Sequence, residues 1–233
     1  MANSRVALAA SVCALGLFVG CADEDGILSD DEKSMLESMT EVPKTQDDPT
    51  NEWSGDASAE SFGQTLYWDQ ALSQDRGLSC SSCHVPSLGW SIADARSLGS
   101  GDTDGSNKSL SRWHSPGVQN LALGDYIFWD GRADSLWMQA RGALTSDGVH
   151  RLAEPRLAKM VIERYPSEYE GLFGAPSVVD LGAVNDMSEL ADFTEEEQAE
   201  FMEISVNIGK AIAAYERTLV TGEPSISVGG ESL

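Results

Sequence analysis

Two cysteines and a histidine stand together in the run Cys80-Ser81-Ser82-Cys83-His84, and no other part of the sequence narrows the possible folds as much. Two thiols three positions apart can form thioether bonds with the two vinyl groups of one porphyrin. The adjacent histidine is then placed to bind the iron. The sequence therefore predicts one covalently attached haem c, with Cys80 and Cys83 as attachment points and His84 as the proximal iron ligand.

Three other roles are open to these residues. A structural zinc site needs a second pair of Cys or His ligands at short spacing, which the sequence does not contain. A thioredoxin-like redox pair needs a βαβ context, which is also missing. A disulfide between Cys80 and Cys83 suits an oxidising compartment, but it leaves His84 without a role.

The first twenty residues have the pattern of a bacterial export signal. Arg5 is followed by fifteen residues without a charge, 6–20, and then by Cys21. This apolar run is shorter than the ~20 residues of a spanning helix, so it fits the hydrophobic region of a signal peptide. We predict a lipoprotein signal peptide over 1–20 and a lipid on Cys21, with ordinary cleavage nearby as the alternative. The protein is then a periplasmic or cell-envelope lipoprotein that meets the membrane only through its lipid anchor.

Acidic residues dominate the chain. Its 15 lysines and arginines stand against 38 aspartates and glutamates, which gives a formal net charge of −23. Such a surface repels phosphates, so we expect no nucleic-acid binding and a cationic macromolecular partner. Residues 21–57 combine many carboxylates with few large apolar side chains. They predict an acidic disordered tether with a short helix over 30–39.

From residue 58 onward the apolar residues recur at helical spacing. Thr194 and Glu197 form a capping box, and apolar residues then repeat at three- and four-residue steps as far as Leu219, before a stop signal at Gly222. The shorter helices are expected over 58–71, 134–144, 155–165 and 166–173. These patterns predict several short helices and one long C-terminal helix.

The segment after the Cys80–His84 run, residues 98–116, is predicted to be a long loop. Residues 98–116 are rich in Gly, Ser and Asp, and a loop of this length is expected to lie over a site. We find no internal repeat and no series of alternating strands. The predicted fold is therefore all-α, a cytochrome c-like haem domain over 58–222, followed by a tail over 223–233.

Several motifs follow one another in a definite order along this domain. They are Leu66-Tyr67-Trp68-Asp69, Leu78-Ser79-Cys80-Ser81-Ser82-Cys83-His84, His114-Ser115-Pro116, Phe128-Trp129-Asp130-Gly131-Arg132-Ala133-Asp134 and Ala213-Ala214-Tyr215-Glu216-Arg217-Thr218-Leu219. This order resembles the N-terminal haem domain of the bacterial di-haem cytochrome c peroxidases and their relatives of MauG type. In that family a second C-x-x-C-H domain follows. We therefore expect a truncated sequence, with 223–233 as the start of the missing domain, or a partner haem on another chain.

The resemblance implies roles for three residues of one loop. Trp129 matches the tryptophan that passes electrons between the two haems, and a core tryptophan is the alternative. Asp130 and Arg132 match the family motif and are expected to hold the loop by an ion pair. The resemblance further implies hydrogen peroxide as substrate and a cytochrome c or another small electron donor as partner.

Two positions depart from the family pattern. The family's distal glutamate, which handles protons during peroxide cleavage, falls at Val149, and valine can neither donate nor accept a proton. The adjacent His150 is the candidate substitute, and an ordinary surface histidine is the alternative. His114 stands where many of these peroxidases have an asparagine that helps to bind calcium. Because histidine is a poor ligand for this cation, calcium is possible but not supported.

Three functions are compatible with these residues. The first is hydrogen peroxide reduction, or MauG-like oxidation of a partner protein's side chain, in an assembly with a second haem domain. The second is a mono-haem electron carrier with His/Met ligation, for which Met138 and Met160 are the available sulfurs. The third is an inactive haem-binding remnant. The family resemblance favours the first.

Overall fold

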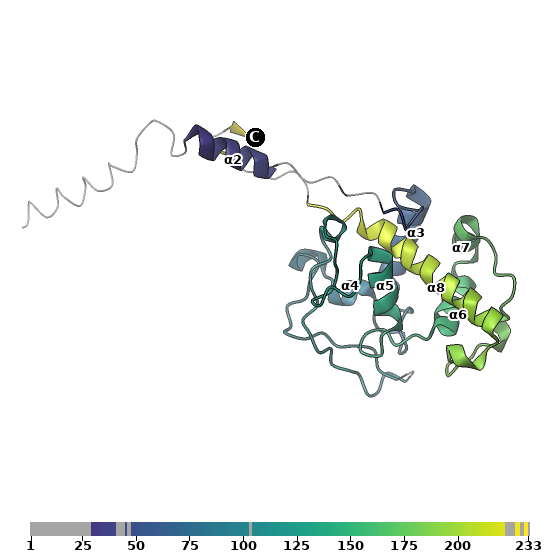
Figure 1. The fold of residues 1–233 in the computed structure, drawn as a ribbon. Coiled ribbons are helices and arrows are strands. Elements are labelled where there is room, and N and C mark those ends of the chain that lie inside the picture. The colour runs from purple at the N-terminus through teal and green to yellow at the C-terminus, as the bar shows by residue number, and fades with distance from the viewer. Residues whose placement is uncertain are drawn as a thin grey trace, which may run out of the picture. The chain divides into compact units, whose positions relative to one another are not determined.

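The structure is a computed structural model that describes residues 29–40, 45, 48–102, 104–221, 227–228 and 231–232. It divides into two units, which we describe separately (Figure 1). The larger unit comprises residues 43–221, and the smaller unit combines the residues before 43 with those after 221. The predicted signal peptide over 1–20 and the predicted lipid site at Cys21 lie outside the described residues.

Helices form the framework of the larger unit. Their bounds are α3 Ala57–Trp68, α4 Cys80–Cys83, α5 Leu136–Thr145, α6 Glu154–Arg164, α7 Pro166–Phe173 and α8 Glu195–Glu216. The 3-10 turns are η1 Pro86–Leu88, η2 Leu121–Leu123, η3 Leu181–Ala183 and η4 Leu190–Asp192. The all-α class predicted from the sequence is confirmed.

Helix α8 is the central element of this unit, and α3, α5 and α6 pack against it (Figure 1). Its predicted capping box is present, because the Thr194 hydroxyl accepts the Glu197 N–H while the Glu197 carboxylate accepts the Thr194 N–H. Phe201 and Ile208 are fully buried along the helix. The helix ends at Glu216, earlier than the predicted repeat, and Gly222 lies outside the described residues.

Two glycines allow α3 and α5 to approach α8 closely. A Cβ atom on Gly63 of α3 would lie 1.9 Å from the carbonyl oxygen of Ala211. A Cβ on Gly209 of α8 would lie 2.6 Å from the carbonyl oxygen of Trp137 in α5. Real atoms do not approach so closely, so only glycine permits these backbone-to-backbone contacts. They set the positions of α3 and α5 against α8.

Helix α3 is shorter than the 58–71 segment expected from the sequence. It ends at Trp68, because Asp69 leaves the helical conformation. The Asp69 carboxylate accepts the hydroxyl of Tyr165 at 2.8 Å and the backbone N–H of Ala71 at 2.9 Å. Through these contacts the Asp69 carboxylate and the backbone N–H of Ala71 have hydrogen-bond partners without continuing the helix.

The larger unit begins before the predicted tether boundary at residue 57. Asn51 is 1% exposed and donates its amide to the carbonyl of Lys210 in α8 at 3.0 Å. The ammonium of Lys210 in turn lies 2.9 Å from the carboxylate of Glu52. Asn51 and Glu52 are thus bonded to α8, and the acidic segment joins the domain earlier than its composition indicates.

The smaller unit contains α2 Asp30–Thr40 and two strands, β1 Ser227–Val228 and β2 Glu231–Ser232, which pair antiparallel. Helix α2 matches the short helix expected over 30–39. Ser29 precedes it, and the Ser29 hydroxyl and N–H both donate to the carboxylate of Glu32 at 2.7 Å. None of the helices in the described ranges is both long enough and apolar enough to cross a membrane.

Candidate functional site

The one-turn helix α4 places the thiols of Cys80 and Cys83 on one side of a single turn, because they are three residues apart. Both are free thiols. The N–H of Ser79 donates to the hydroxyl of Ser82 at 3.0 Å, which closes the start of the turn. Burial raises the pKa of both thiols, and for Cys80 the nearby carboxylate of Glu216 adds to the effect. Both sulfurs are therefore protonated near neutral pH.

His84 follows directly and is oriented by the backbone. Its Nδ1 lies 3.2 Å from the carbonyl oxygen of Trp90. Burial lowers the pKa of His84, so the ring is neutral near pH 7. Since a carbonyl only accepts, Nδ1 carries the proton and Nε2 is the unprotonated nitrogen. A metal-binding histidine is commonly held in this way.

These three residues open onto a cavity of about 670 Å³. Other parts of its wall come from segments 111–118 and 127–132, from α5, from Val149 and His150, and from the end of α8. A volume of this size is typical of sites that enclose a cofactor or a small ligand, ~300–1,000 Å³. The cavity is therefore large enough to hold a cofactor beside the thiols and Nε2 of His84.

Two buried polar atoms of this wall have no hydrogen-bond partner among the described residues. They are Oε1 of Gln139 in α5 and Oε2 of Glu216 in α8. Leaving such an atom unpartnered costs ~1–3 kcal/mol, so its presence at a cavity points to a ligand or water. Together with two thiols and the neutral imidazole of His84, these atoms show that the residues present fit a haem c. Neither residue was predicted as part of the site.

His150 lies inside the same cavity rather than on the surface. Its ring is 3% exposed, and Nδ1 donates to the carbonyl of Leu72. Burial, with a smaller contribution from the neighbouring His84, lowers the pKa of His150 to about 4. Nε2 is thus the unprotonated nitrogen of a neutral ring. The alternative of a plain surface histidine is wrong, and Val149 beside it also lines the cavity with an apolar side chain.

Trp129 stands at the mouth of the cavity and is 65% exposed, so it is not a core tryptophan. Its indole N–H donates to the carbonyl of His114 at 2.9 Å. The expected ion pair is present, because Nη1 of Arg132 lies 2.7 Å from Oδ1 of Asp130. The Arg132 guanidinium also lies 3.8 Å from the ring centroid of Phe128. Because the ion pair is exposed to solvent, packing on Phe128 contributes to holding Arg132.

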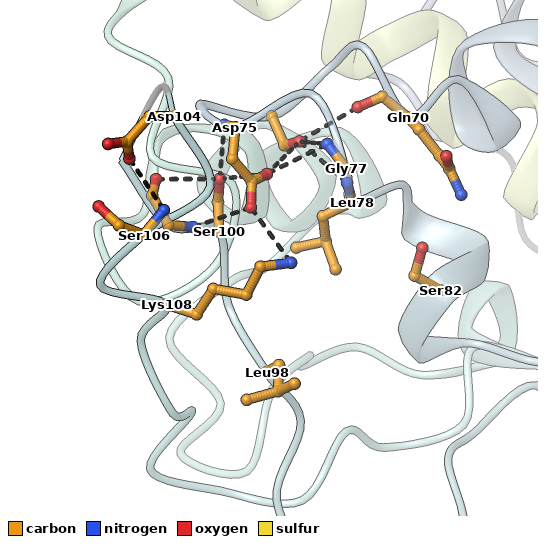
Figure 2. Close-up of polar contacts among 12 residues, drawn as sticks. Gln70, Asp75, Gly77, Leu78, Ser82, Leu98, Ser100, Asp104, Ser106 and Lys108 are labelled. Atoms are coloured by element: carbon orange, nitrogen blue, oxygen red, sulfur yellow. Dashed lines mark hydrogen bonds and ion pairs between the residues drawn. The ribbon is translucent and has the colours of Figure 1, made fainter.

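The loop expected over the site is fastened by a buried carboxylate (Figure 2). Asp75, whose side chain is 2% exposed, accepts the hydroxyl of Ser100 at 2.9 Å and the N–H of Gly101 at 3.1 Å. Lys108 lies 3.4 Å from the same carboxylate. Burial alone would raise the pKa of Asp75, but these hydrogen bonds outweigh it and lower the pKa. The loop reaches the site at Leu98, whose carbonyl accepts the thiol of Cys83 at 3.9 Å.

Other candidate ligands lie outside the cavity or are already bonded. Both ring nitrogens of His114 have partners, the Asp94 carbonyl at 2.9 Å and the Ser91 hydroxyl at 3.0 Å. Met138 is exposed and Met160 packs against the core, and neither lines the cavity. Within the described ranges, no group of three or more His, Cys, Asp or Glu side chains is arranged to hold a metal ion.

Comparisons with known proteins identify relatives that are named as haem peroxidases or MauG proteins. A family model described as di-haem cytochrome c peroxidase matches residues 57–227. The methylamine utilization protein MauG of Methylorubrum extorquens is 31% identical over 168 residues, which cover 70% of this chain and 38% of that protein. Cytochrome-c peroxidase IdrP1 of Denitromonas iodatirespirans is 29% identical over 213 residues, 89% of this chain and 46% of the relative. The chain thus spans less than half the length of these curated relatives.

Solved structures show the same fold. The di-haem peroxidase BthA of Burkholderia thailandensis superposes with a TM-score of 0.53 at 21% identity, over 74% of this chain and 39% of that one. A MauG-like protein associated with microbial copper homeostasis superposes with a TM-score of 0.54 at 17% identity, over 77% of this chain and 45% of its own. The cytochrome c-like helical architecture is therefore confirmed.

Proposed function

The chain belongs to the di-haem cytochrome c peroxidase family, and from this premise we propose that it reduces hydrogen peroxide with electrons from a small c-type cytochrome. One observation carries the proposal. Both thiols of the C-x-x-C-H run, His84 and His150 line a single cavity. This is the set of groups that peroxide reduction at a covalently held haem requires.

In this proposal the chain holds one haem c by residues that the cavity brings together. Cys80 and Cys83 would hold the porphyrin by adding their S–H groups across its two vinyl groups, and Nε2 of His84 would bind the iron. When bound, the haem supplies the redox chemistry of O–O bond cleavage. Gln139 offers an unpartnered oxygen in the cavity wall for a hydrogen bond to a ligand or water.

His150 has the position and protonation state for moving the proton of the substrate. Its Nε2 accepts the proton of one peroxide oxygen and returns it to the other oxygen as the bond between them breaks. Over the whole reaction one hydrogen peroxide, two electrons and two protons yield two waters. Trp129, exposed at the cavity mouth, is the proposed route by which the electrons arrive.

The electrons are proposed to come through a second haem domain, as the description of the family as di-haem suggests. That domain belongs to the same protein or to a partner, and this chain supplies one C-x-x-C-H run. We further propose that the protein is an exported lipoprotein anchored at Cys21. The uncharged run 6–20 directly before that cysteine supports this proposal.

A second candidate function is favoured by His150 itself. Its Nε2 would supply a second nitrogen ligand for the iron in addition to that of His84, and a haem with two such ligands would act as an electron carrier rather than as a peroxidase. The His/Met carrier considered from the sequence has less support, because no methionine of the described residues lines the cavity.

The test is made on the full chain, expressed with the haem-attachment machinery of a c-type cytochrome host. We expect covalent haem, a high-spin absorption spectrum, and peroxide-dependent oxidation of reduced cytochrome c in a stopped-flow experiment. The Cys80→Ser/Cys83→Ser double variant should lose the covalent haem on a denaturing gel. A low-spin spectrum with no reaction toward peroxide would instead support the electron carrier.

A further inference from the structure

Glu216 is a buried carboxyl group that the proposed peroxide chemistry does not use. It is the last residue of α8, its side chain is 2% exposed, and it lines the cavity beside α4. Its Oε2 has no hydrogen-bond partner among the described residues. A carboxyl group in this position is ready to exchange a proton without first breaking a bond at that oxygen.

The surroundings of Glu216 disfavour a negative charge. The C-terminal end of a helix carries a partial negative charge, because its last carbonyl groups have no partner within the helix. The end of α8 therefore repels an anion. The hydroxyl of Tyr67 in α3 and the thiol of Cys80 in α4 interact electrostatically with Glu216, and both are neutral groups whose pKa burial raises. Burial raises the pKa of Glu216 itself to about 8.

Among the described residues, no charged side chain contributes to the raised pKa of Glu216. Its neighbours in the chain are Tyr215, which is electrostatically coupled to Tyr67, and Arg217, the residue that caps the end of α8. The other titratable or charged groups that line the cavity are Cys83, His84, His114, Asp130, Arg132 and His150. Of these, Arg132 is paired with Asp130 at the exposed mouth, and burial keeps His84 and His150 neutral near pH 7. Burial is the only cause of the shift at Glu216.

We propose that Glu216 is a proton-binding site coupled to the oxidation state of the haem held by Cys80, Cys83 and His84. It takes up one proton from solvent when the iron accepts one electron from a c-type cytochrome or a chemical mediator, and it releases the proton when that electron leaves. The physical reason is Coulombic. An electron added to a cavity of low dielectric constant makes a second negative charge there more costly, so the carboxyl group binds a proton more tightly. This inference rests on the haem attachment of the proposed function.

The proposal is tested by spectroelectrochemical titration of the full haem-loaded chain between pH 5 and 9. The midpoint potential of the wild type should fall as the pH rises, with a slope approaching 59 mV per pH unit, the value for one proton per electron. Glu216→Gln, which keeps the shape but cannot ionise, should give a nearly flat dependence. Glu216→Asp should keep the slope. Glu203→Gln, an exposed site on the same helix, should behave as the wild type.

A wild-type potential that does not change with pH would overturn the proposal, and so would a Glu216→Gln variant with the wild-type slope. If Glu216→Gln fails to load haem, infrared difference spectra of the wild type replace it. Reduction should then produce a protonated carboxyl band that shifts when the protein, but not the haem, carries carbon-13 glutamate. Absence of that band, or a band that the label does not move, contradicts the proposal.

The outcome is separate from that of the peroxide test. The potential is measured without peroxide, so a chain that shows the predicted slope but no reaction with peroxide would refute the proposed function and leave Glu216 as the coupled site. A chain that reduces peroxide but has a midpoint potential independent of pH would support the proposed function and refute the role of Glu216.

Discussion

At the scale of the residue, burial acts in opposite directions on the pKa values of His150 and Glu216, the two buried ionisable side chains that the cavity wall adds to the C-x-x-C-H run. Removing a group from water disfavours its charged form, so a buried base has a lowered pKa and a buried acid a raised one. His150, with a pKa of about 4, and Glu216, with a pKa of about 8, are therefore both neutral at pH 7. The wall can thus accept a proton at one residue and release one at the other.

Replacement of His150 tests the proton-transfer step. His150→Gln keeps a donor for the Leu72 carbonyl but removes the basic nitrogen, so the rate constant for reaction with peroxide should fall by ~10²–10⁴-fold. In the wild type the neutral ring is the active form. Because its pKa is lowered to about 4, the rate should be constant above pH 5 and fall as the pH falls through about 4. Stopped-flow traces at single turnover measure both effects.

A rescue variant distinguishes loss of the proton carrier from general damage. Val149 lines the same cavity, so Val149→Glu added to His150→Gln returns an acid–base group to a neighbouring position of the wall. Partial recovery of the rate is expected. An unchanged rate in His150→Gln alone would show that His150 carries no proton in the reaction.

At the scale of the element, helix packing depends on two positions where a side chain is not tolerated. Gly63→Ala would place a Cβ 1.9 Å from the Ala211 carbonyl, so α3 and α8 must separate. Overpacking of this kind typically costs ~1–3 kcal/mol, and we expect at least this loss in the free energy of unfolding, measured with urea.

Gly171 in α7 is the matched control for this substitution. A Cβ there meets nothing within 4 Å. Gly171→Ala should therefore be neutral or stabilising by up to ~1 kcal/mol, because alanine is the better helix former. Equal effects of the two substitutions would mean that the contact between α3 and α8 is not the reason for glycine at residue 63.

The elements differ in how far the sequence predicts them. Helix α8 was predicted from its capping box and apolar spacing, both of which are local. The end of α3 was predicted three residues too late, because the contact of Asp69 with Tyr165 joins residues far apart in sequence. The approach of α3 to α8 at Gly63 likewise depends on tertiary packing.

The same reason explains which site residues were found. The spacing of Cys80, Cys83 and His84 is itself the signal, and the structure places all three on one cavity. Glu216 and Gln139 were not predicted, because a polar residue in a helix indicates a solvent-exposed position unless the tertiary fold is known. The resemblance to the family, which extends to Gln139 and Glu216, was the available hint.

At the scale of the whole molecule, the net charge of −23 governs encounter with an electron donor. A basic cytochrome c is attracted over about one Debye length, which shrinks from ~10 Å at 0.1 M salt to ~3 Å at 1 M. The second-order rate constant for electron transfer from a basic cytochrome should therefore fall, by about tenfold or more, between low and high salt. An acidic cytochrome serves as the control and should show no decrease. A rate independent of salt with the basic donor would contradict electrostatic steering.

In helix α8, a residue that packs against α5 and a residue that lines the cavity lie on nearly the same face of the helix. Gly209, pressed against α5, and Glu216, on the cavity wall, are seven residues apart, which is close to two full turns. The backbone contact at Gly209 therefore fixes the rotation of α8 about its axis, and this rotation determines that Glu216 faces the cavity. Insertion of a single alanine between them would rotate the carboxyl group by ~100° and withdraw it from the wall, while leaving the composition of the helix almost unchanged. The number of residues between Gly209 and Glu216 therefore determines whether the carboxyl group reaches the cavity.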